Sequence, residues 1–166
     1  MAKTHLQGME VNTRGAMPEV GSVAPDFKLV KNDLSEVSLS DLKGKRIVLN
    51  MFPSIDTGVC ATSVRKFNKE AAELANTVVV CASQDLPFAL GRFCGAEGIE
   101  NAITASDFRY NCLADGYNTL MVDGPLAGLL SRSVVVIDEN GKVAYTELVS
   151  EITTEPNYEA ALSVLK

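Results

Sequence analysis

Residues 46–82 read RIVLNMFPSIDTGVCATSVRKFNKEAAELANTVVVCA and contain two apolar runs on either side of an amphipathic segment. The first run, 46–52, stops at Pro53, which is typical of a buried parallel strand. Apolar residues recur at helical spacing over 61–74, and 77–82 is the second apolar run. A strand, a helix and a strand in this order predict a right-handed crossover, in which both strands are parallel members of one sheet.

Shorter elements are predicted on both sides of this crossover. Residues 1–45 are interrupted by glycine and proline, which indicates short strands and turns. The later patterns predict helices at 86–96 and 108–115 with a short apolar stretch at 102–105 between them, a hairpin of 133–138 and 142–148 with an Asn-Gly turn, and a last helix from Thr154 to Leu165. Thr154 is the expected cap of that last helix, and Pro156 suits its first turn.

Together these elements predict an α/β fold. We expect a thioredoxin-like sandwich, in which helices flank a central mixed sheet, with an extra β-hairpin region at the N-terminus. An open dinucleotide-binding sheet fits less well, because no Gly-x-Gly-x-x-Gly follows any predicted strand. At roughly 150 residues per domain, the 166 residues of the chain predict a single domain, 1–166.

Charge and hydropathy argue against two classes of partner. Lysine and arginine number 15 against 21 acidic residues, which gives a net charge of −6. No positive field therefore attracts phosphate backbones or an anionic membrane surface, and we expect neither nucleic acid nor membrane as a partner. The N-terminus lacks the apolar core of a secretory signal, and no run of about 18 apolar residues occurs. We expect a cytoplasmic protein.

The cysteines are Cys60, Cys81, Cys94 and Cys112. In a reducing compartment they predict no permanent disulfide framework, although a transient, catalytic disulfide is compatible with that setting. No Cys-x-x-Cys pair occurs, and His5 is the single histidine. The ligand spacings of a structural zinc site are therefore absent, and we expect no bound metal.

The segment from Pro53 to Cys60 is the candidate site, because ligand sites of α/β sheets lie at the carboxyl ends of parallel strands. Cys60 falls in the first turn of the predicted helix, where unpaired N–H groups and the helix dipole favour the reactive thiolate. The hydroxyl of Thr57 is close enough in sequence to reach the sulfur or a reactant held there, and Pro53 keeps the approach rigid. Alternative interpretations remain: Thr57 as a helix cap, Pro53 as a strand stop and Cys60 as a small apolar filler.

The pattern Pro53-x-x-x-Thr57-x-x-Cys60 resembles the peroxidatic motif of the peroxiredoxins, and Arg132 matches the arginine of that family. Three further stretches, GRFCGAEG at 91–98, DGPLAGL at 123–129 and EITTEPNYEAAL at 151–162, are similar to the bacterial thiol peroxidases, the atypical two-cysteine branch. The likeness extends over essentially the whole chain.

This resemblance implies a homodimeric thioredoxin-fold enzyme of antioxidant defence. Such an enzyme reduces hydrogen peroxide and organic (alkyl) hydroperoxides without metal, haem or flavin, so that no cofactor is expected. Cys60 would be the peroxidatic nucleophile, Cys94 the resolving cysteine of the same subunit, and thioredoxin the electron donor. Arg132 would hold the thiolate and the charge on the departing oxygen. Its alternative interpretation is a solvated charge at the start of a strand.

Cys81 and Cys112 have simpler interpretations. Cys81 lies in an apolar run and is expected to be an inert core thiol, whereas Cys112 is interpreted as helix surface or packing. Gly91 and Gly95 bracket Cys94, and glycine weakens a helix, so we expect the helix at 86–96 to unwind during turnover. Alternatively, these glycines permit close packing or end the helix.

Two rival functions remain, the first from another class and the second closer in chemistry. One is a non-enzymatic thioredoxin-fold module that binds proteins and is unreactive toward peroxide. The other is a dithiol–disulfide oxidoreductase, but that chemistry usually uses two cysteines a helical turn apart, and here Cys60 and Cys94 are far apart in the chain.

Overall fold

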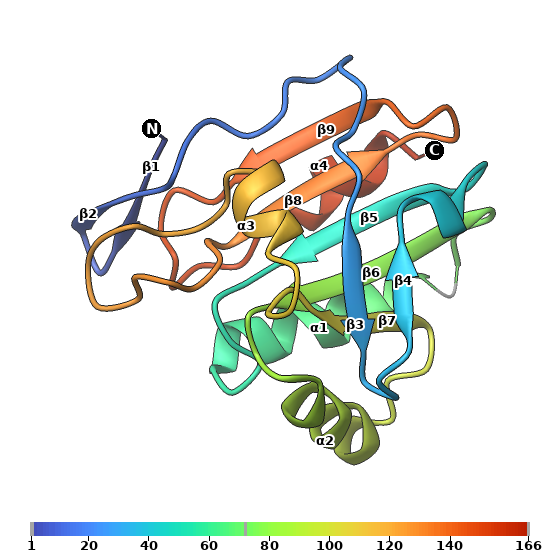
Figure 1. The fold of residues 1–166 in the computed structure, drawn as a ribbon, viewed down its shortest axis with the longest axis horizontal. Helices are drawn as coiled ribbons and strands as arrows, with labels where there is room; N and C mark the ends of the chain where they lie inside the picture. The colour runs from blue at the N-terminus through green and yellow to red at the C-terminus, as the bar shows by residue number, and fades with distance from the viewer. Residues whose placement is uncertain (1, 72, 166) are drawn as a thin grey trace.

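The fold is built on two β-sheets and four α-helices in the part of the chain that the computed structural model describes, residues 2–71 and 73–165 (Figure 1). The strands are β1 (Lys3–Leu6), β2 (Met9–Asn12), β3 (Lys28–Lys31), β4 (Glu36–Ser38), β5 (Arg46–Met51), β6 (Thr77–Ser83), β7 (Ala102–Ser106), β8 (Ser133–Ile137) and β9 (Val143–Leu148). The helices are α1 (Gly58–Ala71), α2 (Pro87–Glu97), α3 (Cys112–Gly116) and α4 (Tyr158–Ser163), with a short 3-10 helix, η1, at Ser40–Leu42.

The larger sheet has the order β4-β3-β7-β6-β5-β8-β9. Strands β5, β6 and β7 are parallel, whereas the other neighbouring pairs are antiparallel. The crossover predicted for 46–82 is therefore confirmed. The short apolar stretch at 102–105, to which the sequence analysis assigned no element, extends this parallel set as β7.

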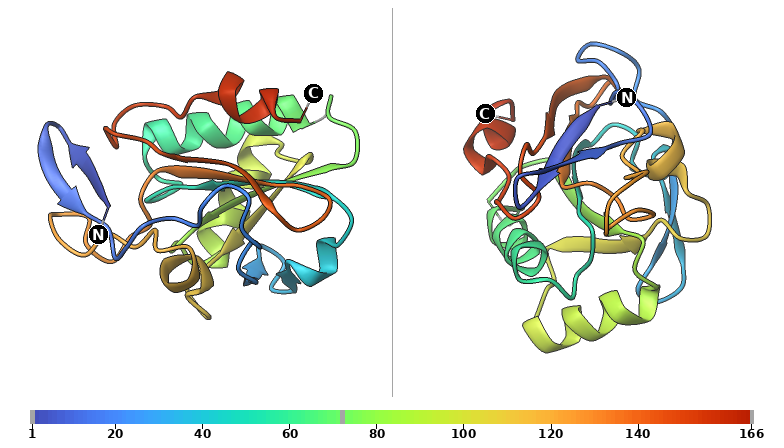
Figure 2. Two further views of the ribbon diagram at one scale, coloured as in Figure 1. Left: turned by 90° about the horizontal axis from the view of Figure 1, so that it is seen from above. Right: turned by 90° about the vertical axis from the view of Figure 1, so that its left-hand side faces the viewer.

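Two apolar cores lie on opposite faces of this sheet. On one face, α1, α2 and α4 cover the strands with side chains that include Phe67, Leu90 and Leu162. On the other face, α3 and the segment before β3 supply Leu113 and Phe27. Figure 2 shows α1 and α4 on one side of the sheet and α3 on the other. The predicted sandwich with a mixed central sheet is confirmed.

The N-terminal hairpin is the second sheet, formed by β1 and β2 alone. Gln7 and Gly8 connect its strands with φ angles of 50° and 85°, the left-handed values that a tight hairpin turn requires. The predicted N-terminal β-hairpin region is confirmed, and Figure 1 shows it projecting beside the main body.

Helix α1 begins earlier than predicted. It runs from Gly58 to Ala71, not over 61–74, and Ala72 lies outside the described residues. Leu74 follows the helix and packs partly against the core. Cys60 is accordingly the third residue of the helix, as the first-turn placement required.

The prediction for the third helix was wrong at its start. Helix α3 begins at Cys112 instead of Phe108. The carboxylate of Asp107 accepts hydrogen bonds from the backbone N–H groups of Leu113 and Ala114, at 2.9 and 3.0 Å. Because Asp107 satisfies the unpaired donors of the first helical turn, the helix starts only beyond it.

The last helix was also predicted to begin too early and to end too late. Helix α4 spans Tyr158–Ser163, and its cap is Asn157, whose side chain accepts a hydrogen bond from the backbone N–H of Ala160 at 3.0 Å. The hydroxyl of Thr154 instead donates to the carbonyl of Glu151 at 2.8 Å and closes a separate turn. Proline disfavours a helical conformation of the residue before it, so Pro156 separates this turn from the helix.

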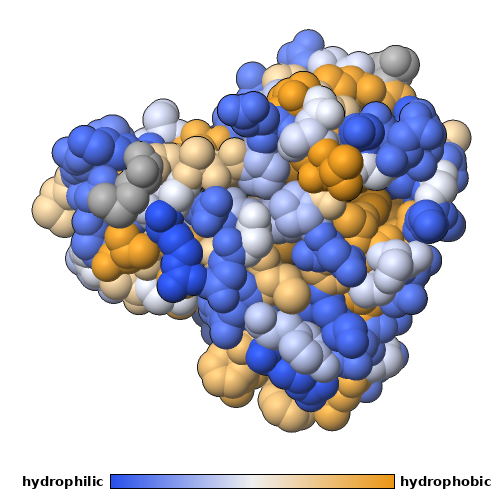
Figure 3. All heavy atoms as spheres, turned by 45° about the horizontal axis from the view of Figure 1, so that its top comes forward, coloured by the Kyte–Doolittle hydropathy of each residue, from blue (hydrophilic) through white to orange (hydrophobic). Residues whose placement is uncertain are grey.

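On the face drawn in Figure 3, apolar residues form small groups among polar ones. Across the described residues, no helix combines the length and the apolar character needed to span a bilayer.

Candidate active site

Cys60 and Arg132 meet at one end of the central sheet. Strand β8 is antiparallel to β5, so that Ser133 pairs with Met51 and the start of β8 lies beside the end of β5. Arg132 immediately precedes β8, and its Nη2 donates to Cys60 Sγ at 3.2 Å. Arg132 is only 3% exposed and Cys60 is 0% exposed. The interpretation of Arg132 as a solvated charge is therefore wrong.

The guanidinium of Arg132 is anchored on one side and has a free donor on the other. Its Nε donates to the carbonyl of Ile152 at 2.7 Å. Its Nη1 is buried and has no hydrogen-bond partner among the described residues. A buried N–H group without a partner is unfavourable, and an oxygen atom bound next to Cys60 would satisfy it.

The N-terminal hairpin supports the loop that orients Arg132. The backbone N–H of Ile152 donates to the carbonyl of His5 at 2.8 Å, and Gly8 N–H donates to the carboxylate of Glu151 at 2.9 Å. Hydrogen bonds from the N–H groups of Thr153 and Gly8 lower the pKa of Glu151 to about 2. Sequence reasoning missed these hydrogen bonds, because they join segments at opposite ends of the chain.

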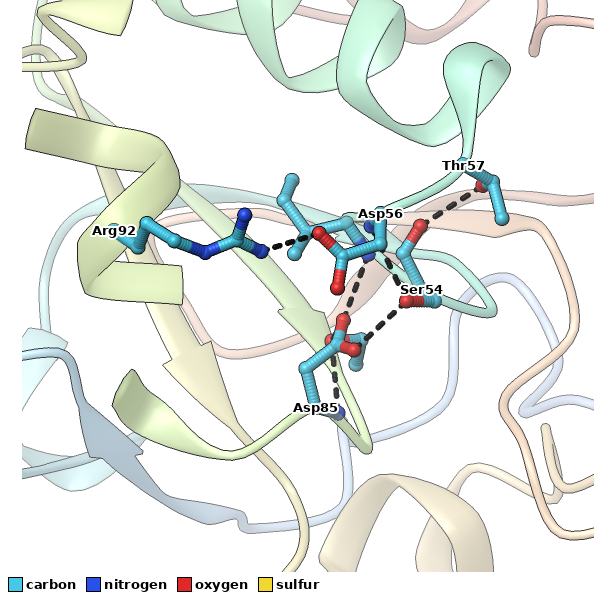
Figure 4. Close-up of polar contacts among 7 residues, drawn as sticks. Ser54, Asp56, Thr57, Asp85 and Arg92 are labelled. Atoms are coloured by element: carbon cyan, nitrogen blue, oxygen red, sulfur yellow. Dashed lines mark hydrogen bonds and ion pairs between the residues drawn. The ribbon is translucent and has the colours of Figure 1, made fainter. Parts of the chain in front are cut away.

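The turn before α1 is held by the carboxylate of a residue that follows the neighbouring strand β6. Ser54 Oγ donates to Asp85 Oδ1 at 2.8 Å, and Ile55 N–H donates to Asp85 Oδ2 at 2.7 Å (Figure 4). Sequence reasoning missed Asp85 as well. The signal that could have found it is its place just after β6, at the same carboxyl edge of the sheet as Cys60.

Thr57 lies at the surface of this turn, and Pro53 is buried at its start. The hydroxyl of Thr57 donates to the carbonyl of Ser54 at 2.9 Å (Figure 4). Its proton is thus directed to the turn, whereas the sequence analysis expected it to reach the sulfur or a reactant. The oxygen of Thr57 keeps its acceptor capacity for a reactant.

Cys94 contacts a hydroxyl group on the neighbouring strand. It is buried on α2, and its Sγ lies 3.0 Å from the Thr104 hydroxyl on β7. Both Cys60 and Cys94 are free thiols in this structure. A bond between them would replace the contact of Cys60 with Arg132 and the contact of Cys94 with Thr104.

Among the described residues, no guanidinium group donates to the sulfur of Cys81 or Cys112 as Arg132 does to Cys60. Cys81 is fully buried in the core on β6, and this burial raises the pKa of its thiol to about 12. At neutral pH it is protonated and unreactive, as expected for a core thiol. Cys112 is half-buried at the start of α3 and packs against the core on the other face of the sheet.

Removal of the Thr57 hydroxyl tests whether this residue contacts the reactant. If the chain reduces hydroperoxides, as its resemblance to the peroxiredoxins implies, we expect Thr57→Val to slow the first reduction by roughly 10- to 10³-fold, because an acceptor for the reacting group is lost. Thr57→Ser, which keeps the hydroxyl, is the matched control and should retain most of the rate. Rapid-quench measurement of peroxide consumption distinguishes them, and a Val variant as fast as the wild type would reduce Thr57 to a helix cap.

Comparison with known proteins identifies relatives over nearly the whole chain. Residues 19–162 match the Redoxin family. A thiol peroxidase from Corynebacterium glutamicum is 61% identical over 99% of both chains. A peroxiredoxin-like protein from Aquifex aeolicus is 42% identical, with a TM-score of 0.92 over 98% of this chain and 95% of the other. A thiol peroxidase from Chromobacterium violaceum has the same fold, with a TM-score of 0.89 at 19% identity over 98% of this chain and 94% of its own.

Proposed function

The chain belongs to the redoxin family as a peroxiredoxin-type enzyme of the thiol peroxidase group, and from this premise we propose that Cys60 reduces hydrogen peroxide and alkyl hydroperoxides. The family resemblance and the thioredoxin-like fold predicted from the sequence are confirmed. The observation that supports Cys60 as the nucleophile is the buried guanidinium of Arg132 on its sulfur, with a further N–H group unpaired.

In the first step, the Cys60 thiolate attacks the terminal oxygen of the hydroperoxide. The S–O bond forms as the O–O bond breaks, and the departing oxygen takes a proton and leaves as an alcohol or, from hydrogen peroxide, as water. Cys60 becomes a sulfenic acid. Arg132 stabilises the thiolate before attack and the charge on the departing oxygen during it, because a guanidinium keeps its proton and offers several donors.

In the second step, the Cys94 thiol attacks the sulfenic sulfur of Cys60. A disulfide forms and water leaves. The dithiol of thioredoxin then reduces this disulfide by exchange and becomes a disulfide itself. No metal, haem or flavin takes part in this cycle.

The complete cycle is tested by NADPH consumption in the presence of thioredoxin, thioredoxin reductase and an organic hydroperoxide. We expect hydroperoxide-dependent oxidation of NADPH with the wild-type protein and none above background with Cys60→Ser. Absence of turnover with the wild type would favour the non-enzymatic binding module. Turnover on protein disulfides without peroxide would favour the dithiol–disulfide oxidoreductase.

Opening of α2 is the conformational step that this cycle requires. Gly91 and Gly95 weaken that helix, and alanine fits at both positions: a Cβ at Gly95 meets no atom within 4 Å, and one at Gly91 lies 3.5 Å from Asn32 Cβ. Each substitution stabilises a helix by about 1 kcal/mol. Gly91→Ala combined with Gly95→Ala should therefore slow disulfide formation by up to roughly 30-fold without slowing the attack on peroxide.

Two measurements check this prediction. Acid quenching and alkylation give the rate of disulfide formation, with Gly116→Ala in α3 as the control substitution. Hydrogen exchange should show lower protection over 88–98 in the oxidised protein than in the reduced protein. Equal protection in the two redox states would mean that α2 does not open when the protein is oxidised.

We also propose that the protein is a homodimer in the cytoplasm, as the family resemblance implies. Exposed apolar side chains support the dimer, since Leu86, Phe88 and Phe108 are 48%, 68% and 60% exposed and line one hollow. Sedimentation equilibrium measures the mass in solution, and a monomer at micromolar concentration would exclude this part of the proposal.

A further inference from the structure

The carboxylate of Asp85 links the segment that precedes α2, the helix of Cys94, to the turn that precedes α1, the helix of Cys60. Asp85 follows β6 and precedes α2, so it lies at the start of the segment that leads to Cys94. Its carboxylate accepts hydrogen bonds from Ser54 Oγ and Ile55 N–H, as described above, and from Ser83 Oγ at 2.6 Å. We propose that Asp85 is a positioning residue that holds Cys60 in the geometry for peroxide attack and must release it for disulfide formation. This inference rests on the proposed function.

The hydrogen bonds of Ser54 carry this restraint to the start of α1. Ser54 Oγ accepts from the N–H of Asp56 at 3.2 Å, and the Ser54 carbonyl accepts from both the N–H and the hydroxyl of Thr57, at 3.2 and 2.9 Å. Helix α1 begins at the next residue. The orientation of the first turn of α1, which carries Cys60, is therefore set by the carboxylate of Asp85 through its hydrogen bond with Ser54.

A second link between the same elements is weaker. Arg92 on α2 forms an ion pair with Asp56 of the turn (Figure 4). Their side chains are 66% and 59% exposed, and exposed ion pairs are screened by water and contribute little. Asp85 is half-buried, and charge-assisted hydrogen bonds shielded from water are the stronger kind. The hydrogen bonds of the Asp85 carboxylate to Ser54 and Ile55, called the Asp85 clasp below, thus restrain the turn more than the Arg92–Asp56 pair does.

Release of the Asp85 clasp has opposite effects on the two chemical steps. Attack on peroxide needs Cys60 beside Arg132, and a misplacement of about 1 Å is enough to slow such a reaction by roughly 100-fold. Disulfide formation needs Cys60 to leave that place, so a loosened turn reaches the open state more often. A variant without the carboxylate should be slower in the first step and equally fast or faster in the second.

The same balance governs over-oxidation of Cys60. A sulfenate that stays beside Arg132 can attack a second hydroperoxide, which transfers one oxygen to sulfur, loses an alcohol and leaves a sulfinic acid. Disulfide formation competes with this reaction by consuming the sulfenic acid. Loss of the Asp85 clasp should therefore lower the yield of sulfinic acid at a given excess of peroxide.

The experiment compares wild-type protein with Asp85→Ala, Asp85→Asn and Ser54→Ala. Asp138→Ala is the matched control, because the Asp138 carboxylate also holds a turn, by accepting from the N–H groups of Asn140 and Lys142 at 2.9 Å, at the opposite end of β8. Rapid quenching gives the rate of peroxide consumption in a single turnover. Alkylation of quenched samples gives the rate of disulfide formation, mass spectrometry gives the sulfinic acid yield, and urea unfolding gives the stability of each variant.

We expect Asp85→Ala to slow peroxide consumption by roughly 10- to 100-fold, with disulfide formation unchanged or faster and less sulfinic acid formed. Asp85→Asn and Ser54→Ala should shift the rates in the same directions by smaller factors. Asp138→Ala should lower the free energy of unfolding and leave the rates of both chemical steps unchanged. If Asp85→Ala does not fold, the other two variants decide the matter.

Peroxide consumption within about twofold of wild type in a folded Asp85 variant would overturn the proposal. Equal slowing of both steps would also overturn it, since a purely structural defect predicts that result. Failure of the proposed function is distinguishable, because the wild-type protein itself would then consume no peroxide in a single turnover.

Discussion

Cys94→Ser is expected to stop the thioredoxin-dependent cycle after one hydroperoxide has been reduced at each site. The first turnover should proceed within about twofold of the wild-type rate, because the thiol of Cys94 contacts Thr104 and not the Cys60 sulfur. Without a resolving thiol, Cys60 stays a sulfenic acid, and hydroperoxide-dependent consumption of NADPH falls to background. A sulfenic-acid-specific reagent should label Cys60 in this variant and not in the oxidised wild type.

Cys112→Ser is the matched control for this experiment. It replaces the same atom on a half-buried cysteine of α3, packed against the core on the opposite face of the sheet, and should leave turnover unchanged. Normal cycling of Cys94→Ser with thioredoxin would remove the resolving role of Cys94 and, with it, the need for α2 to open.

Arg132→Lys and Arg132→Met should both slow the attack on peroxide. The Met variant removes every donor and should lose roughly 10²- to 10³-fold, the range found when one donor to a developing oxyanion is deleted. The Lys variant keeps a positive charge but cannot contact Ile152 and Cys60 with a planar fork as Arg132 does, so an intermediate loss is expected. Single-turnover peroxide consumption measures both variants.

Arg46→Lys is the matched control, since it makes the same arginine-to-lysine substitution away from the site. Arg46 also donates to backbone carbonyls, those of Leu165 and Ala75 at 2.6 Å, but it lies at the start of β5, at the opposite end of that strand from Cys60. Its substitution should affect stability and leave the peroxide step unchanged. An Arg132→Lys variant at the wild-type rate would show that charge alone suffices at that position.

Local patterns predicted the central elements well. The alternation of apolar runs and helical spacing over 46–82 identified β5, α1 and β6, because the two strands are continuous buried runs and α1 is long enough, at 14 residues, to show the helical period. Helices α3 and α4 have only 5 and 6 residues. Their starts depend on which nearby side chain captures the free N–H groups, and Asp107 and Asn157 do so in the structure. Periodicity carries no information on that competition.

The sequence by itself determined the family, the crossover and the position of Cys60 in the first turn of a helix, because these are expressed in contiguous residues. The family resemblance also named Arg132 as a partner of that cysteine, but only the tertiary structure shows how Arg132 is brought there and which other groups support the site. Arg132 reaches it because β8 pairs antiparallel with β5. Ile152 contacts Arg132, and Asp85 contacts the turn before α1. Both contacts are hydrogen bonds between segments that are distant in the chain. Such contacts depend on strand order and loop paths, which arise from packing of the whole sheet and not from any local pattern.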